Sequence, residues 1–357
     1  MNVARAERSS PARLAAAQAL AAVLEDGLTL DDAMDQVSRA QTLEPRDRAF
    51  ALAIALAAFR RKGEIDAILS RHLAKPLPRK SGLARHLLTA GAAQLLVLRS
   101  PAHAVIDETV RIAKSDRNAM HFAGLINAVL RKAAAEAGTS NALPEAWKLN
   151  TPAWLRNRWV SHYGAEAAQR MISAQGQEAP LDVTVKSDAQ SWAAPLGAKI
   201  LPSGTLRLTD TQKPVPDLPG CSEGAWWVQD AASALPVKLL GNVTGLTALD
   251  LCAAPGGKTM QLAAGGAKVV AVDQSGKRLQ RLRDNLSRTG LMAEIVEADA
   301  LSLDLPADFD VVLLDAPCSA TGTIRRHPEL PYLRDARAIP GLAEQQSAML
   351  QAAARHV

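Results

Sequence analysis

The sequence predicts a multidomain protein with an all-α bundle, then a small α+β subdomain, then a doubly wound α/β fold with parallel strands. Apolar residues recur at helical spacing through residues 11–136, and strand-like apolar runs alternate with helical stretches from residue 246 onward. The length of 357 residues exceeds what one ordinary hydrophobic core organises. We place the three domains at residues 1–140, 145–225 and 226–357.

The first domain has the apolar periodicity of packed helices. Leu14, Ala17, Ala21 and Leu24 lie at helical spacing, and residues 48–60 are apolar on nearly every side. The second of these stretches predicts a central, buried helix. Isolated histidines among apolar or basic neighbours predict core or surface positions without a catalytic role, namely His72, His86, His103 and His121.

The helical pattern stops at residues 138–144, which predicts a linker. In the second domain, residues 181–185 alternate like a strand, and residues 195–220 are rich in Pro and Gly. Four of the six tryptophans lie between Trp147 and Trp192. These side chains either form a core, the commoner role, or stack on bases.

Composition and charge narrow the class of protein. Hydrophobic residues make up 48% and charged residues 22%, which is typical of a soluble globular chain. The polar start, the lack of a membrane-length apolar run and three widely spaced cysteines predict a cytoplasmic protein without membrane or metal. We expect a monomer. Residues 1–150 hold 21 Lys+Arg against 15 Asp+Glu, which suits nucleic-acid contact or a solvated face equally.

The third domain has four short apolar runs that predict parallel strands at residues 247–252, 268–273, 293–297 and 309–315. A helix is predicted at residues 276–288. Its basic side chains either touch phosphates or face solvent, namely Lys277, Arg278, Arg281, Arg283 and Arg288.

A glycine-containing loop follows the first predicted strand, within Asp-Leu-Cys-Ala-Ala-Pro-Gly-Gly-Lys-Thr at residues 250–259. A P-loop requires glycine where Cys252 stands, and a dinucleotide site requires a different glycine spacing, so both are disfavoured. A methyl-donor site needs close backbone approach, supplied by Gly256 and Gly257, and a helix N-terminus for a carboxylate. Lys258 would add a counter-charge. The loop therefore predicts an S-adenosylmethionine site.

Acidic residues follow the later strands. Asp273 lies 17 positions after Gly256, where a carboxylate accepts ribose hydroxyls in related folds. Asp299 is expected near the adenine end of the cofactor, and Asp315 ends the fourth strand at the same crevice.

A cysteine after the fourth strand has a specific chemical use. C5 of cytosine is a poor nucleophile until a thiolate adds to C6, and Cys318 lies within Asp-Ala-Pro-Cys-Ser-Ala-Thr-Gly beside the predicted donor site. Asp315 would hold the amino edge of the cytosine or position the cofactor. The base must leave its stack to reach such a pocket.

These motifs, together with Val-Gln-Asp-Ala-Ala-Ser at residues 228–233 and Arg-Arg-His-Pro-Glu at 325–329, resemble the Sun/Nop2 family of RNA cytosine-C5 methyltransferases. The first domain resembles the NusB-like RNA-binding domain in Pro-Arg-Asp-Arg at 45–48, in residues 105–110 and in residues 125–132. The resemblance implies a Rossmann-like S-adenosylmethionine-dependent methyltransferase that acts on 16S ribosomal RNA. Carried over by position, it also implies that the cofactor contacts are Cys252, Ala253, Ala254, Pro255, Gly256, Gly257, Lys258, Asp273, Asp299 and Asp315.

One feature departs from the family pattern. The resemblance implies that the nucleophile is a second cysteine, in a Thr-Cys motif after a fifth strand, and that Cys318 assists product release. The sequence has no cysteine after Cys318 and ends in a predicted helix at residues 341–354, and four strands would leave a sheet edge unpaired. We therefore expect a C-terminally truncated record that is inactive as it stands.

Two other interpretations stay open. The chain could be a natural short form that acts as an RNA-binding adaptor without catalysis. Alternatively, Cys318 could itself be the nucleophile, as the Pro-Cys cysteine is in DNA cytosine methyltransferases.

Overall fold

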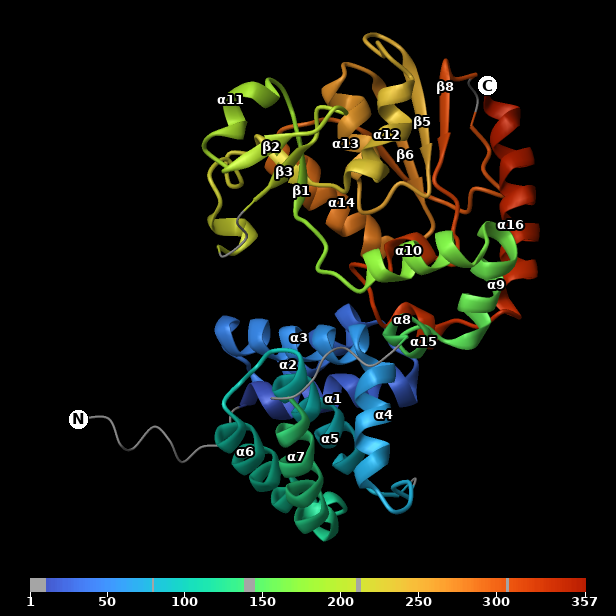
Figure 1. Cartoon of the computed structure of the whole chain (residues 1–357). Coiled ribbons are helices and arrows are strands. Elements are labelled where there is room, and N and C mark those ends of the chain that lie inside the picture. The colour runs from blue at the N-terminus through green and yellow to red at the C-terminus, as the bar shows by residue number, and fades with distance from the viewer. Residues whose placement is uncertain (1–10, 79, 138–144, 210–212, 306–307) are drawn as a thin grey trace. The chain divides into compact units, whose positions relative to one another are not determined.

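The structure is a computed structural model that describes residues 11–78, 80–137, 145–209, 213–305 and 308–357 (Figure 1). The chain forms two compact units. The helical unit comprises residues up to Ala179 together with Ala320–Ala338, and the sheet unit comprises Pro180–Ser319 and Ile339–Val357. The predicted linker at 138–144 lies outside the described residues. No helix within the described parts of the chain has both the length and the apolar character needed to cross a membrane.

The helical unit begins with seven helices around one apolar core. Their bounds are α1 Pro11–Asp26, α2 Leu30–Gln41, α3 Pro45–Arg60, α4 Lys62–His72, α5 Ala84–Leu96, α6 Ala102–Ser115 and α7 Ala123–Ala137. Many of the buried positions are alanines, which let the helices approach closely. Three shorter helices follow, α8 Ala146–Leu149, α9 Ala153–Tyr163 and α10 Ala165–Gln175.

The most enclosed helix differs from the predicted one. α3 buries one broad face, including Ile54 and Phe59, but Ala49 on its other side is exposed. α5 instead is buried at every position except Arg85 and Leu96. Gly91 explains this close packing, because a Cβ there would lie 2.8 Å from a methyl carbon of the Leu130 side chain on α7. The bundle therefore has a central, buried helix as predicted, but that helix is α5 and not the predicted α3.

The four histidines of this unit lie at core or surface positions, as predicted: His72 and His86 have carboxylate partners, and His103 and His121 are exposed. His86 is 2% exposed, and its Nε2 lies 2.7 Å from Glu25 Oε1. Burial lowers the pKa of His86 despite this carboxylate. His72 Nε2 similarly lies 2.6 Å from Glu136 Oε1.

A small antiparallel sheet opens the sheet unit. Its strands are β1 Asp182–Val185, β2 Ala198–Ile200, β3 Leu206–Leu208 and β4 Trp226–Val228, in the order β2-β3-β1-β4. The predicted strand at 181–185 is β1. Trp192 and Trp226 pack in the core of this sheet, whereas Trp154 and Trp159 pack in the helical unit. These tryptophans therefore serve as core residues in the structure.

The four predicted parallel strands are present as β5 Thr247–Leu251, β6 Lys268–Asp273, β7 Glu294–Glu297 and β8 Val311–Leu314. Their order is β7-β6-β5-β8, and all pairs are parallel. β5 is thus central and paired on both sides. The carboxyl ends of β5, β6 and β8 meet at one edge, because Leu251 is in register with both Val272 and Leu314.

Helices cover both faces of the parallel sheet (Figure 1). Side chains of α13 Gly257–Ala264 and α14 Gly276–Thr289 pack with Ala271 on one face. Met349 of α16 Ala338–Ala353 packs with Leu249, Leu251 and Val272 on the other. α12 Ala231–Leu239 adds to the first face next to Ala248. Alternate residues of each strand therefore enter opposite cores, as a doubly wound fold requires.

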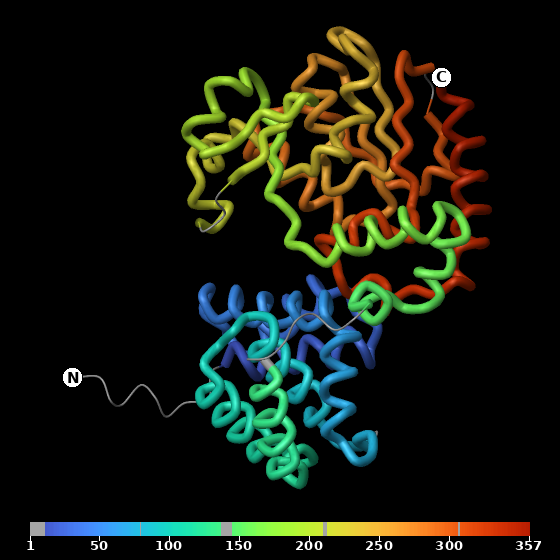
Figure 2. The backbone as a smooth tube through the Cα atoms, in the orientation of Figure 1, coloured from blue at the N-terminus to red at the C-terminus, as the bar shows by residue number. Residues whose placement is uncertain are grey.

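The chain returns to the helical unit immediately after the Pro-Cys motif, as the backbone trace in Figure 2 shows. This returning segment, residues 320–338, includes the short helix α15 Leu330–Leu333. Its Ile324 and Leu330 pack against Leu155 and Trp159 of α9. The sequence analysis placed residues 320–338 in the α/β domain. Nothing in the local sequence of this segment indicates that it packs against α9, more than 150 residues earlier in the chain.

Candidate cofactor and reaction site

The loop Cys252–Lys258 joins central strand β5 to helix α13. Cys252 has a left-handed φ of 62°, so the strand ends one residue earlier than predicted. The Ala253 N–H donates to Val272 O at 3.0 Å, and the Gly256 N–H donates to Ala253 O at 2.8 Å. These bonds fold the loop tightly over the edge of the sheet.

The two glycines of the loop are required for different reasons. Gly256 has φ of 105°, and a Cβ there would overlap the Leu282 side chain on α14. Gly257 begins α13, and a Cβ there would meet only the Gln229 side chain, at 3.5 Å. Packing against Leu282 and the backbone conformation therefore both require glycine at position 256. At position 257 the protein leaves room, which suits close approach by a ligand.

Asp273, at the end of β6, is directly beside this loop. Its Oδ2 accepts the Ala254 N–H at 3.2 Å and lies 3.3 Å from Arg278 Nη1, and its Oδ1 accepts the Ser275 N–H at 3.0 Å. The side chain is 2% exposed. A carboxylate offers about four lone-pair positions, so these partners leave capacity for a hydroxyl donor. Asp273 therefore fastens the loop to β6 in addition to facing the predicted site.

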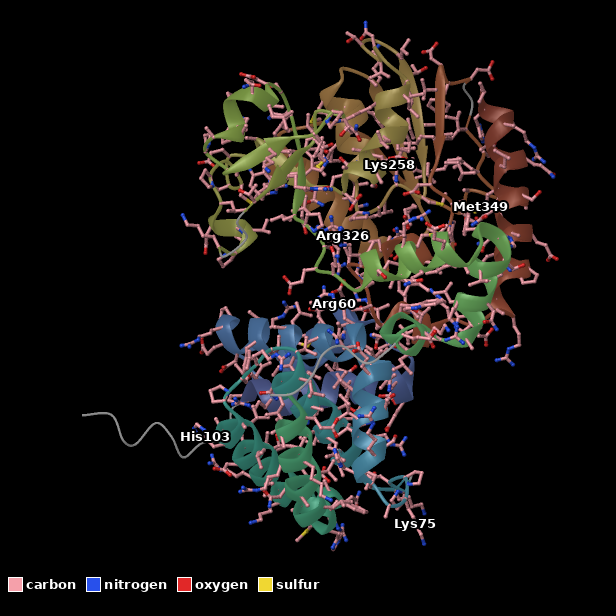
Figure 3. All side chains as sticks on the ribbon, in the orientation of Figure 1. Arg60, Lys75, His103, Lys258, Arg326 and Met349 are labelled. Carbon is pink, nitrogen blue, oxygen red and sulfur yellow. The ribbon has the colours of Figure 1, made fainter. Side chains whose placement is uncertain are left out.

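Lys258 and Asp315 join the ends of β5 and β8. Lys258 Nζ lies 2.5 Å from Asp315 Oδ2, and the Asp315 N–H donates to Leu251 O at 3.2 Å. The Lys258 side chain is 13% exposed, but that of Asp315 is 58% exposed. Figure 3 locates Lys258 in the sheet unit. The two residues form a charged pair whose acidic member is accessible to a substrate.

Asp299 lies just beyond the end of β7 and is exposed. Its Oδ1 accepts the Leu301 N–H at 3.0 Å in a local turn. The structure thus places Asp299 at the outermost strand of the same edge, and Asp273 and Asp315 at the two strands that flank β5.

Asp250 is a buried acidic residue, next to the loop, that sequence reasoning missed. It is fully buried within β5, its Oδ2 accepts the Thr259 hydroxyl at 2.6 Å, and its Oδ1 has no hydrogen-bond partner in the described structure. Burial raises the pKa of Asp250 to about 7, with the Thr259 bond opposing the shift. The available signal was an acidic residue that interrupts an apolar central strand.

Two basic residues of α14, Arg278 and Arg288, have partners that the sequence did not reveal. Arg278 binds Asp273, and its guanidinium donates to Ala254 O. Arg288 Nη1 donates to the carbonyls of Cys221 and Trp226 at 2.9 and 3.0 Å. These two arginines therefore hold the cofactor loop and the small sheet in place.

Cys252 and Cys318, the two cysteines of the predicted site, differ in their surroundings. Cys252 lies inside the loop, where burial first and then the charge of Asp273 raise its pKa to about 11, so its thiol stays protonated. Cys318 is exposed and follows β8. Gln346 Nε2 of α16 donates to Pro317 O at 2.8 Å and so fixes the backbone next to Cys318. Of these two thiols, Cys318 is the one that a substrate can reach.

This set of groups fits S-adenosylmethionine. Four features lie in or next to the loop Cys252–Lys258. They are Gly257, whose added Cβ would meet no close contact, the N-terminus of α13, the buried carboxylate of Asp273 at the end of β6, and the unpartnered Oδ1 of Asp250 on β5. A ligand with a carboxylate, ribose hydroxyls and a cationic donor matches these features. Among the described residues, no cluster of His, Cys, Asp and Glu is arranged to hold a metal ion.

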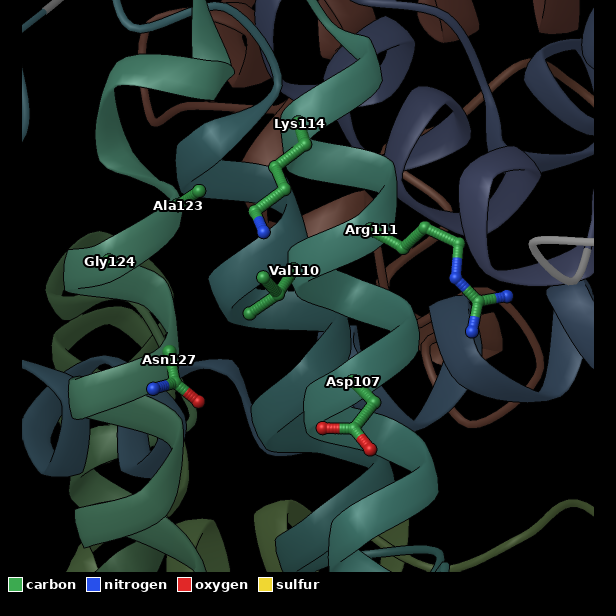
Figure 4. A pocket seen from close by; sticks show the side chains of 7 residues that line it. All are labelled: Asp107, Val110, Arg111, Lys114, Ala123, Gly124 and Asn127. Carbon is green, nitrogen blue, oxygen red and sulfur yellow. The ribbon is translucent and has the colours of Figure 1, made fainter. Parts of the chain in front are cut away.

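A separate groove lies on the helical unit between α6 and α7 (Figure 4). Asp107, Arg111 and Lys114 come from α6, and Gly124 and Asn127 come from α7. The groove mixes acidic and basic groups over a small apolar floor, and it contains none of the residues predicted for catalysis.

Comparison with known families agrees with both halves of the chain. The family profile described as 16S rRNA methyltransferase RsmB/F matches residues 237–357, and the NusB family profile matches residues 10–135. Two solved structures share the fold. One, described as PH0851, has a TM-score of 0.76 at 22% identity and covers 98% of this chain and 84% of its own. The other, NSun6 from Pyrococcus horikoshii with SFG, an S-adenosylmethionine analogue, has a TM-score of 0.51 at 19% identity, with coverage of 57% and 79%.

Whole-length relatives are more similar. The chain is 36% identical over 367 residues to the Ribosomal RNA small subunit methyltransferase B of Shigella sonnei, a match that covers 97% of this chain and 83% of that protein. The protein of the same name from Escherichia coli O157:H7 matches with the same identity and coverage. At 36% identity, this chain aligns with 83% of the length of the Shigella sonnei protein. The chain therefore belongs to the RsmB/F family of 16S rRNA cytosine methyltransferases, with an N-terminal NusB domain.

Proposed function

We propose that this protein transfers a methyl group from S-adenosylmethionine to C5 of a cytosine in 16S ribosomal RNA. The observation that carries the proposal is the meeting of the glycine loop, the Lys258–Asp315 pair and exposed Cys318 around the ends of β5 and β8. The relatives of similar length are named as methyltransferases of small-subunit ribosomal RNA, which supports the choice of substrate.

The cofactor is held by the loop Cys252–Lys258 and by the strand-end acids Asp273, Asp299 and Asp315. Bound there, S-adenosylmethionine supplies an electrophilic methyl group on a sulfonium. The role of the chain is to orient it: Gly257 permits close backbone approach, and the N-terminus of α13 faces its carboxylate. Asp273 accepts the ribose hydroxyls with the lone pairs that its loop contacts leave open.

The chemistry at the base proceeds by addition and elimination. A cysteine thiolate would add to C6 of the extruded cytosine. C5 of the resulting enamine would then take the methyl group as its bond to the sulfonium sulfur breaks, which leaves S-adenosylhomocysteine. A base then removes the C5 proton, and expulsion of the thiolate restores the aromatic ring. Asp315, exposed beside Lys258, accepts a hydrogen bond from the exocyclic amino group of the cytosine and holds the ring in place.

Two cysteine roles are distinguishable by experiment. By family resemblance, the cysteine of a Thr-Cys motif adds to C6, and Cys318 assists release of the methylated base. A Cys318→Ala variant of the intact gene product should then still transfer methyl and should accumulate a covalent RNA adduct, seen as a slow band on a denaturing gel. Loss of both transfer and adduct would instead identify Cys318 as the nucleophile.

The substrate is tested by mapping 5-methylcytosine in 16S ribosomal RNA by mass spectrometry. A strain that lacks this gene should lose one such modification, and the wild-type gene should restore it. An Asp315→Ala gene should not restore it, although the protein accumulates normally. An unchanged modification pattern in the deletion strain would refute the proposed substrate.

A further inference from the structure

We propose that Arg60 and Arg325 of the helical unit bind a backbone phosphate of the RNA substrate. This inference rests on the proposed function and adds a binding site outside the methyl-transfer site. Arg60 is the last residue of α3, and Arg325 lies in the returning segment next to Arg326 (Figure 3). Both arginines belong to the same compact unit.

The Arg60 guanidinium is largely buried, contacts the backbone of Arg325 and is poorly neutralised. The Arg60 side chain is 12% exposed, and its Nη2 donates to the carbonyl oxygen of Arg325 at 3.4 Å. The nearest carboxylate in an ion pair with Arg60 is that of Glu178, at 3.9 Å, and the Glu178 side chain is 90% exposed. Such a distant and solvated partner neutralises little of the charge.

Unused donors accompany this charge. The Nε atoms of Arg60 and Arg325 are both buried and have no hydrogen-bond partner in the described structure. An unsatisfied buried donor destabilises the fold, and more so if it is charged. Burial lowers the pKa of Arg60, and the charge of Arg325 lowers it further while Glu178 opposes the shift. An anion that accepts from both guanidiniums would remove both penalties.

The surroundings favour a phosphate group of RNA. The hollow beside Arg60 is lined by polar, uncharged Asn150, Thr151 and Gln175 and by apolar groups, with no acidic residue among its described lining. Guanidinium forks match phosphate oxygens geometrically. Arg325 follows Cys318 by seven residues in the chain, and RNA is the polyanion that we propose as the substrate of this protein.

The test measures binding of the full-length protein to a 16S RNA fragment that contains the modified cytosine, over a range of salt concentrations. Arg60→Gln and Arg325→Gln should each weaken binding at least several-fold. The double variant should reduce the slope of log K against log salt by about 0.7, the value for one single-strand phosphate. Arg39→Gln, at an exposed position of α2 in the same unit, is the matched control and should change neither quantity.

Lysine variants separate a binding role from a structural one. Arg60→Lys and Arg325→Lys keep the charge but lose the planar fork, so they should preserve the salt slope while lowering affinity. Thermal unfolding and S-adenosylmethionine affinity are measured for every variant. If the Gln double variant is folded and binds RNA with unchanged affinity and slope, the inference is wrong. If the Gln variants unfold and the folded Lys variants bind like wild type, it is also wrong.

Failure of the inference and failure of the proposed function give different results. If wild type methylates the fragment and the arginine variants bind it normally, only the phosphate site is refuted. If wild type neither binds nor methylates the fragment, the proposed function itself fails.

Discussion

At the scale of single residues, Asp273 has two tasks in one carboxylate. It accepts the backbone N–H groups of Ala254 and Ser275 and pairs with Arg278, which fixes the loop that we propose to hold the cofactor. A carboxylate has lone pairs beyond these contacts, and we propose that they accept the ribose hydroxyls. A residue that both builds a site and contacts its ligand should be intolerant of truncation.

Asp273→Ala should therefore weaken S-adenosylmethionine binding by roughly 1.5–3 kcal/mol, or about 10- to 100-fold, because a charged acceptor is lost. Calorimetric titration measures this directly. Asp284→Ala is the matched control, since Asp284 is exposed on α14 and accepts only from Gln280. Equal affinities of wild type and Asp273→Ala would refute the assignment of Asp273.

Asp250 gives a prediction for pH dependence. Its folded pKa of about 7 lies above the unfolded value of 3.8, so the folded state holds a proton that the unfolded state has released between these values. The resulting stability is full below the unfolded pKa and is lost as pH rises through about 7. Asp250→Asn removes this titration.

The melting temperature of ligand-free wild type should accordingly fall relative to that of Asp250→Asn between about pH 5 and about pH 8. Differential scanning fluorimetry at a series of pH values measures the difference. A difference that stays constant over this range would show that Asp250 does not titrate there.

The positions of two predicted residues follow from the ends of the parallel strands. Asp273 and Asp315 end or follow strands whose carboxyl ends converge, so their places follow from strand order alone. Asp250 and Arg278 were missed because their importance depends on tertiary contacts with Thr259, Ala254 and Asp273. No local pattern encodes these contacts.

At the scale of elements, alanine variants of the two glycines between β5 and α13 test whether this loop is a ligand site that depends on glycine. Gly256→Ala places a methyl group against Leu282 at a φ that disfavours side chains, so it should lower the melting temperature of the ligand-free protein. Gly257→Ala meets only Gln229 at ordinary contact distance, so it should leave that temperature nearly unchanged.

S-adenosylmethionine binding should nevertheless weaken at least several-fold in Gly257→Ala, because the added methyl group stands where the ligand approaches. Gly290→Ala is the control: its new Cβ would have open space around it at a position outside the loop, so S-adenosylmethionine affinity should stay unchanged. Full affinity in Gly257→Ala would mean that position 257 is not a site of close ligand approach.

Elements with strong local signals were predictable, and elements fixed by distant packing were not. All four parallel strands lie within one or two residues of their predicted bounds, since apolar runs between turns mark them clearly. The helical region predicted at 11–136 is helical, but α5 is more enclosed than α3. The difference depends on Gly91 and its neighbour Leu130, which adjoin only in the folded bundle.

At the scale of the whole molecule, the chain crosses between its two compact units more than once. The sheet unit contains the residues that we propose for the cofactor and the reaction, and the returning segment then completes the core of the helical unit through Ile324 and Leu330. Glu329 in this segment is 1% exposed and accepts the Leu30 N–H at the start of α2, at 3.4 Å. The stretch after Cys318 thus serves the fold of the helical unit, which no periodicity in the sequence indicates.

The central claim is that the loop between β5 and α13 holds S-adenosylmethionine, and a calorimetric ligand panel on the full-length protein tests it most directly. Wild type should bind S-adenosylmethionine at a single site and should show no heat of binding with ATP or NAD, because the loop lacks the glycines that cradle a polyphosphate. Binding of ATP or NAD without binding of S-adenosylmethionine would contradict the account.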